Sequence, residues 1–237
     1  MKELTIDGYK FLTYEIGKAT YVFSTGENQL NFNKAVPEGL ENLDKLKQWF
    51  GVDTVAYSNQ SHSDIVTYFK SYVEDGDGLV SSTKNIALGV FTADCVPILL
   101  YDKNKEAIAA IHSGWRGTHM SIAVEAINKM RDCFNSSPED IFAVIGPHNR
   151  KCCYEVGEEV LEKFRIQEIY KDVEFSSGNK LNLYACIEKQ LLESGLKKEN
   201  IIDANFCTYC SKEQIFHSYR KSQENYSRMF SFIYLKQ

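Results

Sequence analysis

Short runs of hydrophobic residues recur along most of the chain and predict β-strands interleaved with a few helices. Residues 11–16 and 20–24 alternate in polarity and are rich in aromatic and β-branched side chains, so they predict two early strands. Residues 85–90, 96–101 and 107–111 are apolar runs of the kind found in buried strands. The middle of the chain is therefore expected to form the core of a sheet.

Four other segments carry apolar residues at helical spacing. Residues 39–50 and 122–130 each place their apolar side chains on one face, which predicts helices packed against the sheet. Residues 156–164 show the same spacing, and residues 183–196 predict a further helix whose first turn is capped by Asn182. The helices are fewer than the strands.

The balance of strands and helices predicts the fold class. Residues 141–145 and 229–235 add two more buried strands, and several strands are joined by short turns. These features favour a mixed sheet over an all-parallel one. No linker, low-complexity segment or repeat divides the 237 residues. We therefore predict an α/β fold of the α+β type, with a mixed β-sheet core and flanking helices in a single domain over residues 1–237.

Charge and composition exclude several classes of protein. The formal charge is −5, and the 27 Lys and Arg residues are scattered rather than gathered into a basic stripe, so nucleic acid is not an expected partner. The N-terminus lacks the apolar run of a signal peptide, and no stretch approaches the roughly 18 apolar residues of a membrane span. A cytoplasmic protein is expected. Its seven cysteines are then expected to be reduced thiols, either buried or bound to metal.

Cys95 and His112 are predicted to face each other across a hairpin. Asp102-Lys103-Asn104-Lys105 is interpreted as a two-residue turn between the strands at 96–101 and 107–111. In that register Cys95 lies directly opposite His112, with the two Cβ atoms about 5 Å apart. A slip of one residue would send one of the side chains to the other face. If the register holds, the two side chains are close enough to share one metal ion.

His62 is the candidate for a third ligand. It lies in the polar segment Gln60-Ser61-His62-Ser63-Asp64, where an isolated histidine is more often simply exposed to solvent. A thiolate and imidazoles together favour zinc over magnesium or calcium, which prefer oxygen ligands. Three protein ligands with a fourth position open are typical of catalytic zinc. Cys95 and His112 are therefore the predicted metal ligands, and His62 is the candidate that would complete the set if it converges with them.

An anion-binding turn is predicted directly after His112. The turn joins the end of a strand to the start of a helix, where backbone N–H groups and the helix dipole favour anions. Arg116 adds a planar guanidinium suited to phosphate or carboxylate. The alternative is an ordinary tight turn with a capping threonine and a surface arginine. The predicted substrate-binding residues are Ser113, Gly114, Arg116, Gly117 and Thr118.

Four further cysteines are interpreted as buried thiols. Cys207 and Cys210 have the spacing of a metal or redox pair, but no second pair is expected near them to complete a site with four ligands. Cys152 and Cys153 are adjacent, so in a strand their side chains would point apart and would not share a ligand. These cysteines are not predicted to bind metal.

Several of these motifs together resemble the YfiH/laccase-domain family, and the resemblance covers most of the chain. They are Gln60-Ser61-His62-Ser63-Asp64, Thr92-Ala93-Asp94-Cys95-Val96-Pro97, His112-Ser113-Gly114-Trp115-Arg116-Gly117-Thr118, and Gly146-Pro147 followed by Cys152-Cys153-Tyr154-Glu155-Val156. Members of that family have been called polyphenol oxidases and are now described as purine nucleoside phosphorylases with adenosine deaminase activity. Their zinc is held by His, Cys and His, which fall on His62, Cys95 and His112.

The resemblance implies zinc-dependent phosphorolysis of adenosine, inosine, guanosine or methylthioadenosine. Arg116 and its turn would hold phosphate, and Asp94 or Asp64 would move a proton in a secondary deamination of adenosine. One departure concerns substrate preference: this chain has His148-Asn149-Arg150-Lys151 where the family usually has Gly-Pro-Ser followed by small residues. Purine nucleosides and phosphate are thus the expected partners, with no membrane and no nucleic acid.

Two other functions stay open at this point. The first is a copper-dependent oxidase of phenols, with Cu²⁺ in place of zinc, although a multicopper centre needs far more histidines than the five present. The second is a protein that binds nucleosides without turning them over. An open metal position beside an anion-binding turn argues against a metal that only holds the fold together.

Overall fold

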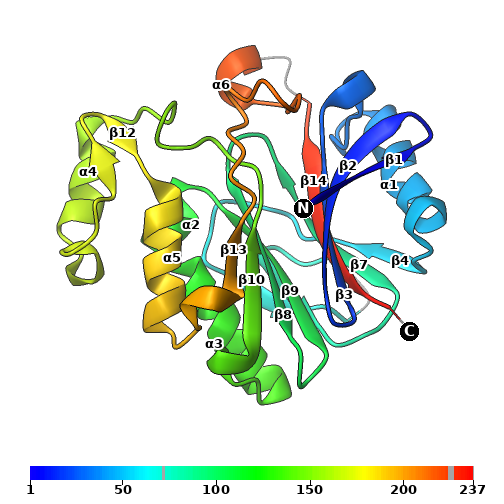
Figure 1. The fold of residues 1–237 in the computed structure, drawn as a ribbon, viewed down its shortest axis with the longest axis horizontal. Helices are drawn as coiled ribbons and strands as arrows, with labels where there is room; N and C mark the ends of the chain where they lie inside the picture. Colours follow the sequence, from blue (N-terminus) through cyan, green and yellow to red (C-terminus); the bar gives the residue numbers. More distant parts are fainter. Residues whose placement is uncertain (71–72, 224–226, 237) are drawn as a thin grey trace.

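Two six-stranded β-sheets form the centre of the molecule (Figure 1). The computed structural model describes residues 1–70, 73–223 and 227–236. In spatial order the first sheet contains β1 (Lys2–Ile6), β2 (Tyr9–Ile16), β3 (Ala19–Ser24), β14 (Met229–Leu235), β7 (Ile86–Thr92) and β4 (Thr54–Ala56). The second contains β13 (Ile201–Asp203), β10 (Ile141–Ile145), β8 (Val96–Asp102), β9 (Ala107–Ser113), β6 (Gly78–Ser81) and β5 (Val66–Tyr68). Each sheet mixes parallel and antiparallel pairs, which confirms the predicted α+β class.

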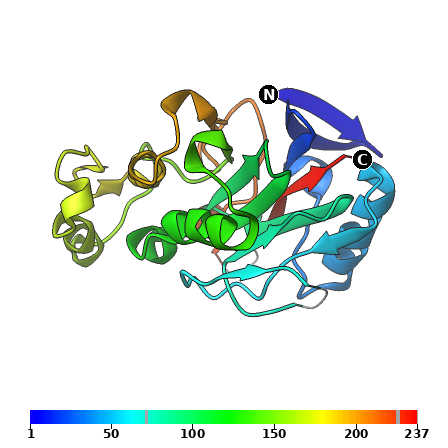
Figure 2. The same ribbon diagram turned by 90° about the horizontal axis from the view of Figure 1, so that it is seen from below.

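Helices cover the outer faces of the two sheets (Figures 1 and 2). The first sheet packs against α1 (Pro37–Phe50), and the second against α3 (Ile122–Phe134) and α5 (Leu183–Glu193). The remaining elements are α2 (Trp115–His119), α4 (Glu158–Arg165), α6 (Tyr219–Ser222), the hairpin of β11 (Ser176–Ser177) and β12 (Lys180–Leu181), and short 3-10 helices at Glu27–Gln29, Pro138–Asp140, Glu168–Tyr170 and Lys198–Asn200. The order of layers is helix, sheet, sheet, helices.

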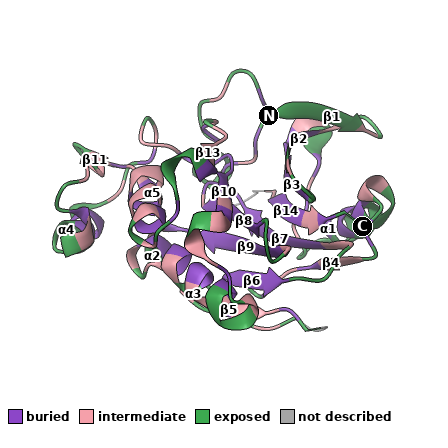
Figure 3. Ribbon diagram, turned by 60° about the horizontal axis from the view of Figure 1, so that its bottom comes forward, coloured by how far each residue is buried: buried purple, intermediate pink, exposed green. Residues whose placement is uncertain are grey.

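Both faces of the second sheet are buried, and this explains its uninterrupted apolar runs (Figure 3). In β9, Ile108 and Ala110 point to the layer between the sheets, whereas Ala109 and Ile111 point to the helices. Each Val, Leu or Ile side chain buried in this way stabilises the fold by about 1.5–3 kcal/mol. The strands β8 and β9 therefore form a rigid platform for the residues at their ends.

The predicted helix boundaries are confirmed where the sequence carries a clear signal. The helix α1 stops at Gly51 as predicted, and the φ of +65° at Gly51 lies in the left-handed region that glycine favours. The helix begins at Pro37, before the predicted start at residue 39. The N-cap of α5 is Asn182, whose side chain accepts a hydrogen bond from the N–H of Ala185 at 3.3 Å. No helix in the described part of the chain is long and apolar enough to cross a membrane.

The predicted hairpin register between β8 and β9 is wrong. His112 pairs with Pro97 rather than with Cys95, because the connection runs over residues 103–106 instead of two residues. A side-chain oxygen of Asp102 accepts the N–H groups of Asn104 and Lys105 at 2.8 and 3.0 Å, which holds the longer turn. The register differs from the predicted one by two residues, and a shift of two leaves each side chain on the same face.

Candidate metal centre

The structure brings together the three residues that the sequence predicts as metal ligands. Nitrogen or sulfur atoms of His62, Cys95 and His112 all lie within 4.8 Å of one another. Sγ of Cys95 is 3.8 Å from Nε2 of His62, and the two imidazole rings stand at 79° with centroids 4.8 Å apart. We call this group the His–Cys–His centre; its binding of a metal stays a prediction.

Each member of the centre comes from a different segment. His62 lies in the loop before β5, Cys95 in the turn between β7 and β8, and His112 near the end of β9. Cys95 comes two residues before Pro97, the partner of His112, so Cys95 and His112 are diagonal neighbours on one face of the strand pair. The side chains meet across a diagonal and not across a direct pair.

The fully buried carboxylate of Asp77 positions two members of the centre. One oxygen accepts a hydrogen bond from Nδ1 of His112 at 2.7 Å, and the carboxylate also accepts the backbone N–H groups of Ser61, His62 and Ser63 at 3.1, 3.0 and 2.6 Å. The hydroxyl of Ser63 donates to it as well. A single side chain thus orients His112 and folds the loop that carries His62.

Sequence reasoning missed Asp77. The only available signal is an aspartate between Gly76 and Gly78 directly before a strand, and that pattern also fits an ordinary turn. What identifies Asp77 in the structure is the convergence of five donors on a carboxylate that has no exposed surface. Those donors come from segments far apart in the sequence.

The centre carries separated charges in the absence of a metal. Burial acts to raise the pKa of Asp77, but hydrogen bonds from His112 and Ser63 outweigh it and hold the pKa well below its usual range. Burial also acts to raise the pKa of Cys95, yet His112 and His62 lower it to about 6. Burial alone would lower the pKa of His112, but the Cys95 thiolate and Asp77 raise it to about 9. A thiolate therefore faces an imidazolium at neutral pH.

The donor set fits a borderline or soft divalent metal ion. One thiolate and two imidazoles favour zinc or copper over magnesium and calcium. Because Nδ1 of His112 is bonded to Asp77, its Nε2 is the nitrogen left for a metal. A carboxylate bonded to the far nitrogen of a histidine is typical of metal-binding histidines. The residues of the centre thus fit three protein ligands of one metal ion, which can be either zinc or copper.

Glycines in the turn after His112 leave room for the centre. A Cβ atom on Gly114 would lie 2.9 Å from Cδ2 of His62 and 3.1 Å from Sγ of Cys95. On Gly117 it would lie 3.2 Å from the carbonyl oxygen of Ser63. A larger residue at position 114 would therefore require His62 to move, and one at position 117 would require a small shift of the backbone at Ser63. The two glycines therefore let the His62 loop approach the end of β9.

Arg116 is exposed, whereas the other four predicted substrate-binding residues are buried. The hydroxyl of Thr118 donates to the carbonyl oxygen of Gly114 at 3.0 Å, so the hydroxyl of Ser113 donates to Thr118 at 2.8 Å. Both hydroxyls are thus used inside the turn. The guanidinium carbon of Arg116 lies 4.6 Å from the centroid of the Trp115 ring. Arg116 is the side chain of this turn that can meet an anion.

Asp94 and Asp64, the predicted acid–base residues, have different surroundings. The carboxylate of Asp94 is buried and accepts hydrogen bonds from the hydroxyls of Thr208 and Ser218 at 2.6 and 3.0 Å and from the N–H of Arg220 at 2.8 Å. Asp64 is half-buried two residues after His62, and no hydrogen bond joins its carboxylate to the described residues. The geometry favours a positioning role for Asp94.

Tyr154 and Arg220 lie beside the centre and were missed by sequence reasoning. The guanidinium carbon of Arg220 lies 5.2 Å from the centroid of the Tyr154 ring. Burial is the main cause that raises the pKa of Tyr154; the charge of Cys95 adds to the rise, whereas Arg220 and Arg116 oppose it. Both arginines are therefore within electrostatic reach of the Tyr154 phenol. Tyr154 belongs to a motif of the family resemblance, but no role was predicted for it. Nothing in the sequence places Arg220 beside it, because the contact depends on folding the C-terminal loop back.

The unusual segment after Gly146-Pro147 makes internal contacts. His148 is buried, Nδ1 donates to the carbonyl oxygen two residues earlier at 2.8 Å, and burial lowers its pKa to about 4, so the ring is neutral. Arg150 forms two hydrogen bonds of 2.8 Å with the carboxylate of Asp203. Lys151 pairs with Glu174. The basic side chains of this segment are thus neutralised by carboxylates.

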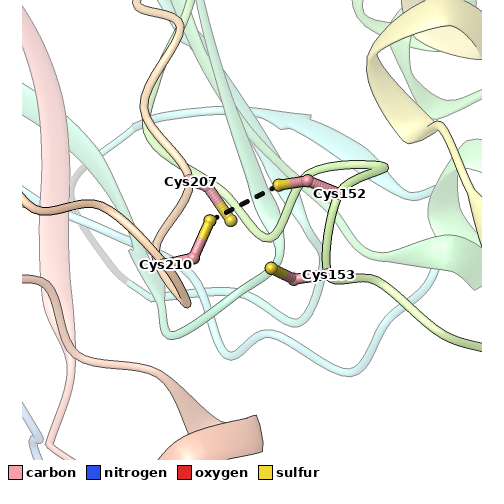
Figure 4. A group of neighbouring side chains, drawn as sticks. All are labelled: Cys152, Cys153, Cys207 and Cys210. Carbon is pink, nitrogen blue, oxygen red and sulfur yellow. Dashed lines mark hydrogen bonds between the residues drawn. The ribbon is translucent and has the colours of Figure 1, made fainter.

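The interpretation of the four other cysteines as buried thiols with no second pair nearby is wrong, because Cys152 and Cys210 are exposed and only Cys207 is buried. Cys152 and Cys153 lie in a turn rather than a strand, so their side chains do not point apart. Their sulfur atoms and those of Cys207 and Cys210 all lie within 4.8 Å of one another (Figure 4). The prediction that no second cysteine pair lies near Cys207 and Cys210 is wrong, because the turn and the later loop approach each other only in the folded chain.

Comparisons with known proteins agree with this architecture. Residues 11–236 match the family described as multi-copper polyphenol oxidoreductase laccase. The chain is 47% identical over 233 residues to a purine nucleoside phosphorylase of Clostridium acetobutylicum, with 98% of each chain covered. It is 34% identical over 170 residues to an adenosine deaminase from an unknown prokaryotic organism, covering 69% of this chain and 64% of that protein. The crystal structure of the hypothetical protein YfiH of Bacillus licheniformis is similar, with a TM-score of 0.82, 27% identity and coverage of 92% and 93%.

Proposed function

The chain belongs to the multi-copper polyphenol oxidoreductase laccase family, and on that premise we propose that it is a zinc-dependent purine nucleoside phosphorylase. Relatives named purine nucleoside phosphorylase and adenosine deaminase support an enzyme that acts on purine nucleosides. The observation that carries the proposal is the position of Tyr154, whose ring contacts Arg220 and whose pKa is affected by the charges of both Cys95 and Arg116. A candidate metal centre with two arginines close to the same phenol suits a reaction that consumes phosphate.

Phosphorolysis needs phosphate held against the ribose. We assign this task to Arg116, because its guanidinium is exposed and can present two parallel N–H donors to phosphate oxygens. Arg220 adds a second positive charge against the ring of Tyr154. Ser113, Gly117 and Thr118 contribute by shaping the turn from which Arg116 projects, since their side chains are absent or bonded within it. Gly114 contributes the space beside the ligands.

In the proposed reaction a phosphate oxygen forms a bond to C1′ of the ribose while the bond from C1′ to the purine nitrogen breaks. The electron pair of that bond leaves with the purine, which takes up a proton, and the products are the free base and ribose 1-phosphate. Burial raises the pKa of Tyr154, so its phenol stays protonated and can donate a hydrogen bond to the substrate. A zinc ion, when held by His62, Cys95 and His112, would supply Lewis acidity to the reaction.

Deamination of adenosine is proposed as a secondary activity at the same centre. It requires a side chain that can accept and release a proton. We assign this proton transfer to Asp64, whose carboxylate is half-buried close to His62 in the sequence and is not used by the fold. Asp94 instead holds the turn that carries Cys95, because both of its oxygens already accept hydrogen bonds.

Copper-dependent oxidation of phenols is the alternative that the same donors allow. Copper binds such a nitrogen and sulfur site more tightly than zinc does. However, in the described residues histidines gather with other ligand side chains only at the His–Cys–His centre, and a multicopper site needs several such groups.

The thiolates and the substrates of the proposed reaction suit a cytoplasmic enzyme, which we include in the proposal.

The test is an assay of purified, metal-quantified protein with inosine, adenosine, guanosine or methylthioadenosine, with and without phosphate. Base release and ammonia are followed together. We expect phosphate-dependent base release that is lost in Cys95→Ala and retained in Cys133→Ala, because Cys133 is an exposed thiol on α3. Oxidation of phenols without turnover of any nucleoside would refute the proposal. Nucleoside binding without turnover would instead identify a binding protein.

A further inference from the structure

Cys152, Cys153, Cys207 and Cys210 form a second group of ligand atoms, which we call the four-cysteine cluster (Figure 4). Cys152 and Cys153 lie in the turn at residues 151–153, which follows β10. Cys207 and Cys210 lie in the loop after β13. All four sulfur atoms are within 4.8 Å of one another, and Sγ of Cys152 is 3.5 Å from Sγ of Cys210.

The sulfur spacing separates the possible roles of the cluster. A disulfide needs a bond of about 2.05 Å, much shorter than the 3.5 Å between Cys152 and Cys210. In a tetrahedral zinc site with bonds of about 2.3 Å, neighbouring sulfurs lie about 3.8 Å apart. An iron–sulfur cluster places several irons and inorganic sulfurs between the thiolates and so holds them further apart. The observed spacing is close to that of a site for one metal ion.

We propose that the four-cysteine cluster binds one zinc ion as a structural site, separate from the His–Cys–His centre. Four thiolates are the donor set that selects zinc in closed sites, and no position is left for a substrate. The proposal does not depend on the proposed enzymatic activity. The proposed structural zinc would be a second metal ion in the chain, beside the proposed catalytic one.

The polypeptide around the cluster suits a charged tetrathiolate. Burial acts to raise the pKa of Cys207, but the backbone N–H groups of Arg150, Cys210 and Tyr209 lower it. Such N–H groups stabilise thiolates, just as they stabilise other anions. The side chain of Lys180 donates to the carbonyl oxygen of Cys152 at 2.9 Å, which places a further positive charge close by. A zinc ion with four thiolates has a net charge of about −2, which these groups offset.

The two loops that supply the cysteines are already joined by other contacts. His148 and Cys207 form an isolated β-bridge, and the N–H of Thr208 donates to the carbonyl oxygen of His148 at 2.9 Å. Arg150 of the first loop also forms a salt bridge with Asp203, the last residue of β13 before the second loop. The cysteines are therefore held together by groups other than the metal. A preformed set of ligands lowers the entropy lost when the metal binds.

The four-cysteine cluster is connected to the His–Cys–His centre through Asp94. The N–H of Asn149 donates to the carbonyl oxygen of Asp94 at 2.9 Å, and the hydroxyl of Thr208 donates to its carboxylate at 2.6 Å. Asn149 and Thr208 come one from each of the joined loops. Asp94 directly precedes Cys95, so a metal that locks the loops also restrains Cys95. This is the purpose that we infer for the second metal.

Metal counting on the reduced full-length protein tests the proposal. After loading with zinc and removal of loosely bound ions, we expect about two zinc ions per chain in the wild type. Cys152→Ser/Cys210→Ser should retain about one, Cys95→Ser should also retain about one, and Cys133→Ser should retain about two. Wild-type zinc content in Cys152→Ser/Cys210→Ser would overturn the proposal, as would a wild type that holds a single zinc lost in Cys95→Ser.

A second measurement uses chains in which the four-cysteine cluster is unchanged. Cys152, Cys210 and Cys133 are all exposed, so a maleimide should modify all three in metal-free protein. Zinc should slow the modification of Cys152 and Cys210 by at least about tenfold and leave Cys133 unaffected. In Cys95→Ser, cobalt should give the charge-transfer bands of a tetrahedral tetrathiolate. Equal modification rates with and without zinc, or a Cys152–Cys210 disulfide in protein isolated under reducing conditions, would contradict the proposal.

Discussion

Asp77 accepts a hydrogen bond of 2.7 Å from Nδ1 of His112, and the same buried carboxylate accepts the backbone N–H of His62. Two members of the His–Cys–His centre, 50 positions apart in the sequence, therefore depend on one side chain. The third member, Cys95, is held by the turn that Asp94 stabilises. The centre is built by two buried aspartates with different partners.

Replacing Asp77 by asparagine should weaken metal binding at the His–Cys–His centre by about 10–100-fold. The amide loses the negative charge, and its NH₂ group faces N–H donors that the carboxylate accepted. The measurement is competition with a metal chelator, with Cys95→Ser used to identify the signal of this centre. The control is Asp75→Asn, an exposed position two residues away. Unchanged affinity in Asp77→Asn would contradict the assigned role.

Metal uptake by the His–Cys–His centre should release about one proton at pH 8. In the metal-free centre, the Cys95 pKa of about 6 means that the thiol has already lost its proton, whereas the His112 pKa of about 9 means that the imidazole still carries one. A metal displaces the proton of His112. Below pH 6 the Cys95 proton must also leave, so affinity should fall more steeply there.

Calorimetry in buffers of different ionisation enthalpy measures this proton release. The protein used is Cys152→Ser/Cys210→Ser, so that the four-cysteine cluster does not contribute protons of its own. Metal uptake by Asp77→Asn in the same background should release fewer protons, because the loss of the carboxylate removes a cause of the raised His112 pKa. Uptake without any proton release at pH 8 would show that the metal-free centre does not hold an imidazolium.

Arg116→Ala should raise the KM for phosphate by about 10–100-fold, corresponding to the loss of a charge-assisted hydrogen bond worth about 1.5–3 kcal/mol. Arg116→Lys should recover part of the loss, because lysine keeps the charge but not the paired donors. The matched control is Arg131→Ala, an exposed arginine on α3. Initial rates at varied phosphate measure the effect, and an unchanged phosphate KM in Arg116→Ala would remove Arg116 from the proposed site.

Asp64→Asn and Asp94→Asn should affect different properties. Asp64→Asn should lower ammonia release from adenosine by about 10²–10⁴-fold and leave thermal stability unchanged, since it removes a proton carrier. Asp94→Asn should lower the melting temperature, because a buried acceptor of three hydrogen bonds is altered. Ammonia release and thermal unfolding are measured on both variants. A fully stable Asp94→Asn protein that has lost deamination alone would reverse the assignment.

The strands and helices could be predicted because their signals are local. The apolar runs in β8 and β9 and the cap at Asn182 are each contained in a few neighbouring residues. The hairpin register could not be predicted, since it depends on how Asp102 holds the turn. Cys95 and His112 were still placed together, because the error of two residues left both on the same face.

The surroundings of the site could not be predicted, because they arise from contacts between distant segments. Asp77 is defined by donors from the His62 loop and from β9. The four-cysteine cluster depends on the bridge between His148 and Cys207, which no local pattern announces. His62 entered the predicted ligand set mainly through the family resemblance. Only the folded structure shows that its loop places it beside Cys95 and His112.

The most direct test of the central claim is phosphorus NMR of a reaction mixture that contains zinc-loaded protein, inosine and inorganic phosphate. The account predicts that the phosphate signal decreases as a ribose 1-phosphate signal grows, in equal amount to the hypoxanthine released. It also predicts that neither change occurs with Cys95→Ala. Release of hypoxanthine with no loss of inorganic phosphate, or no release by the zinc-loaded protein, would contradict the account.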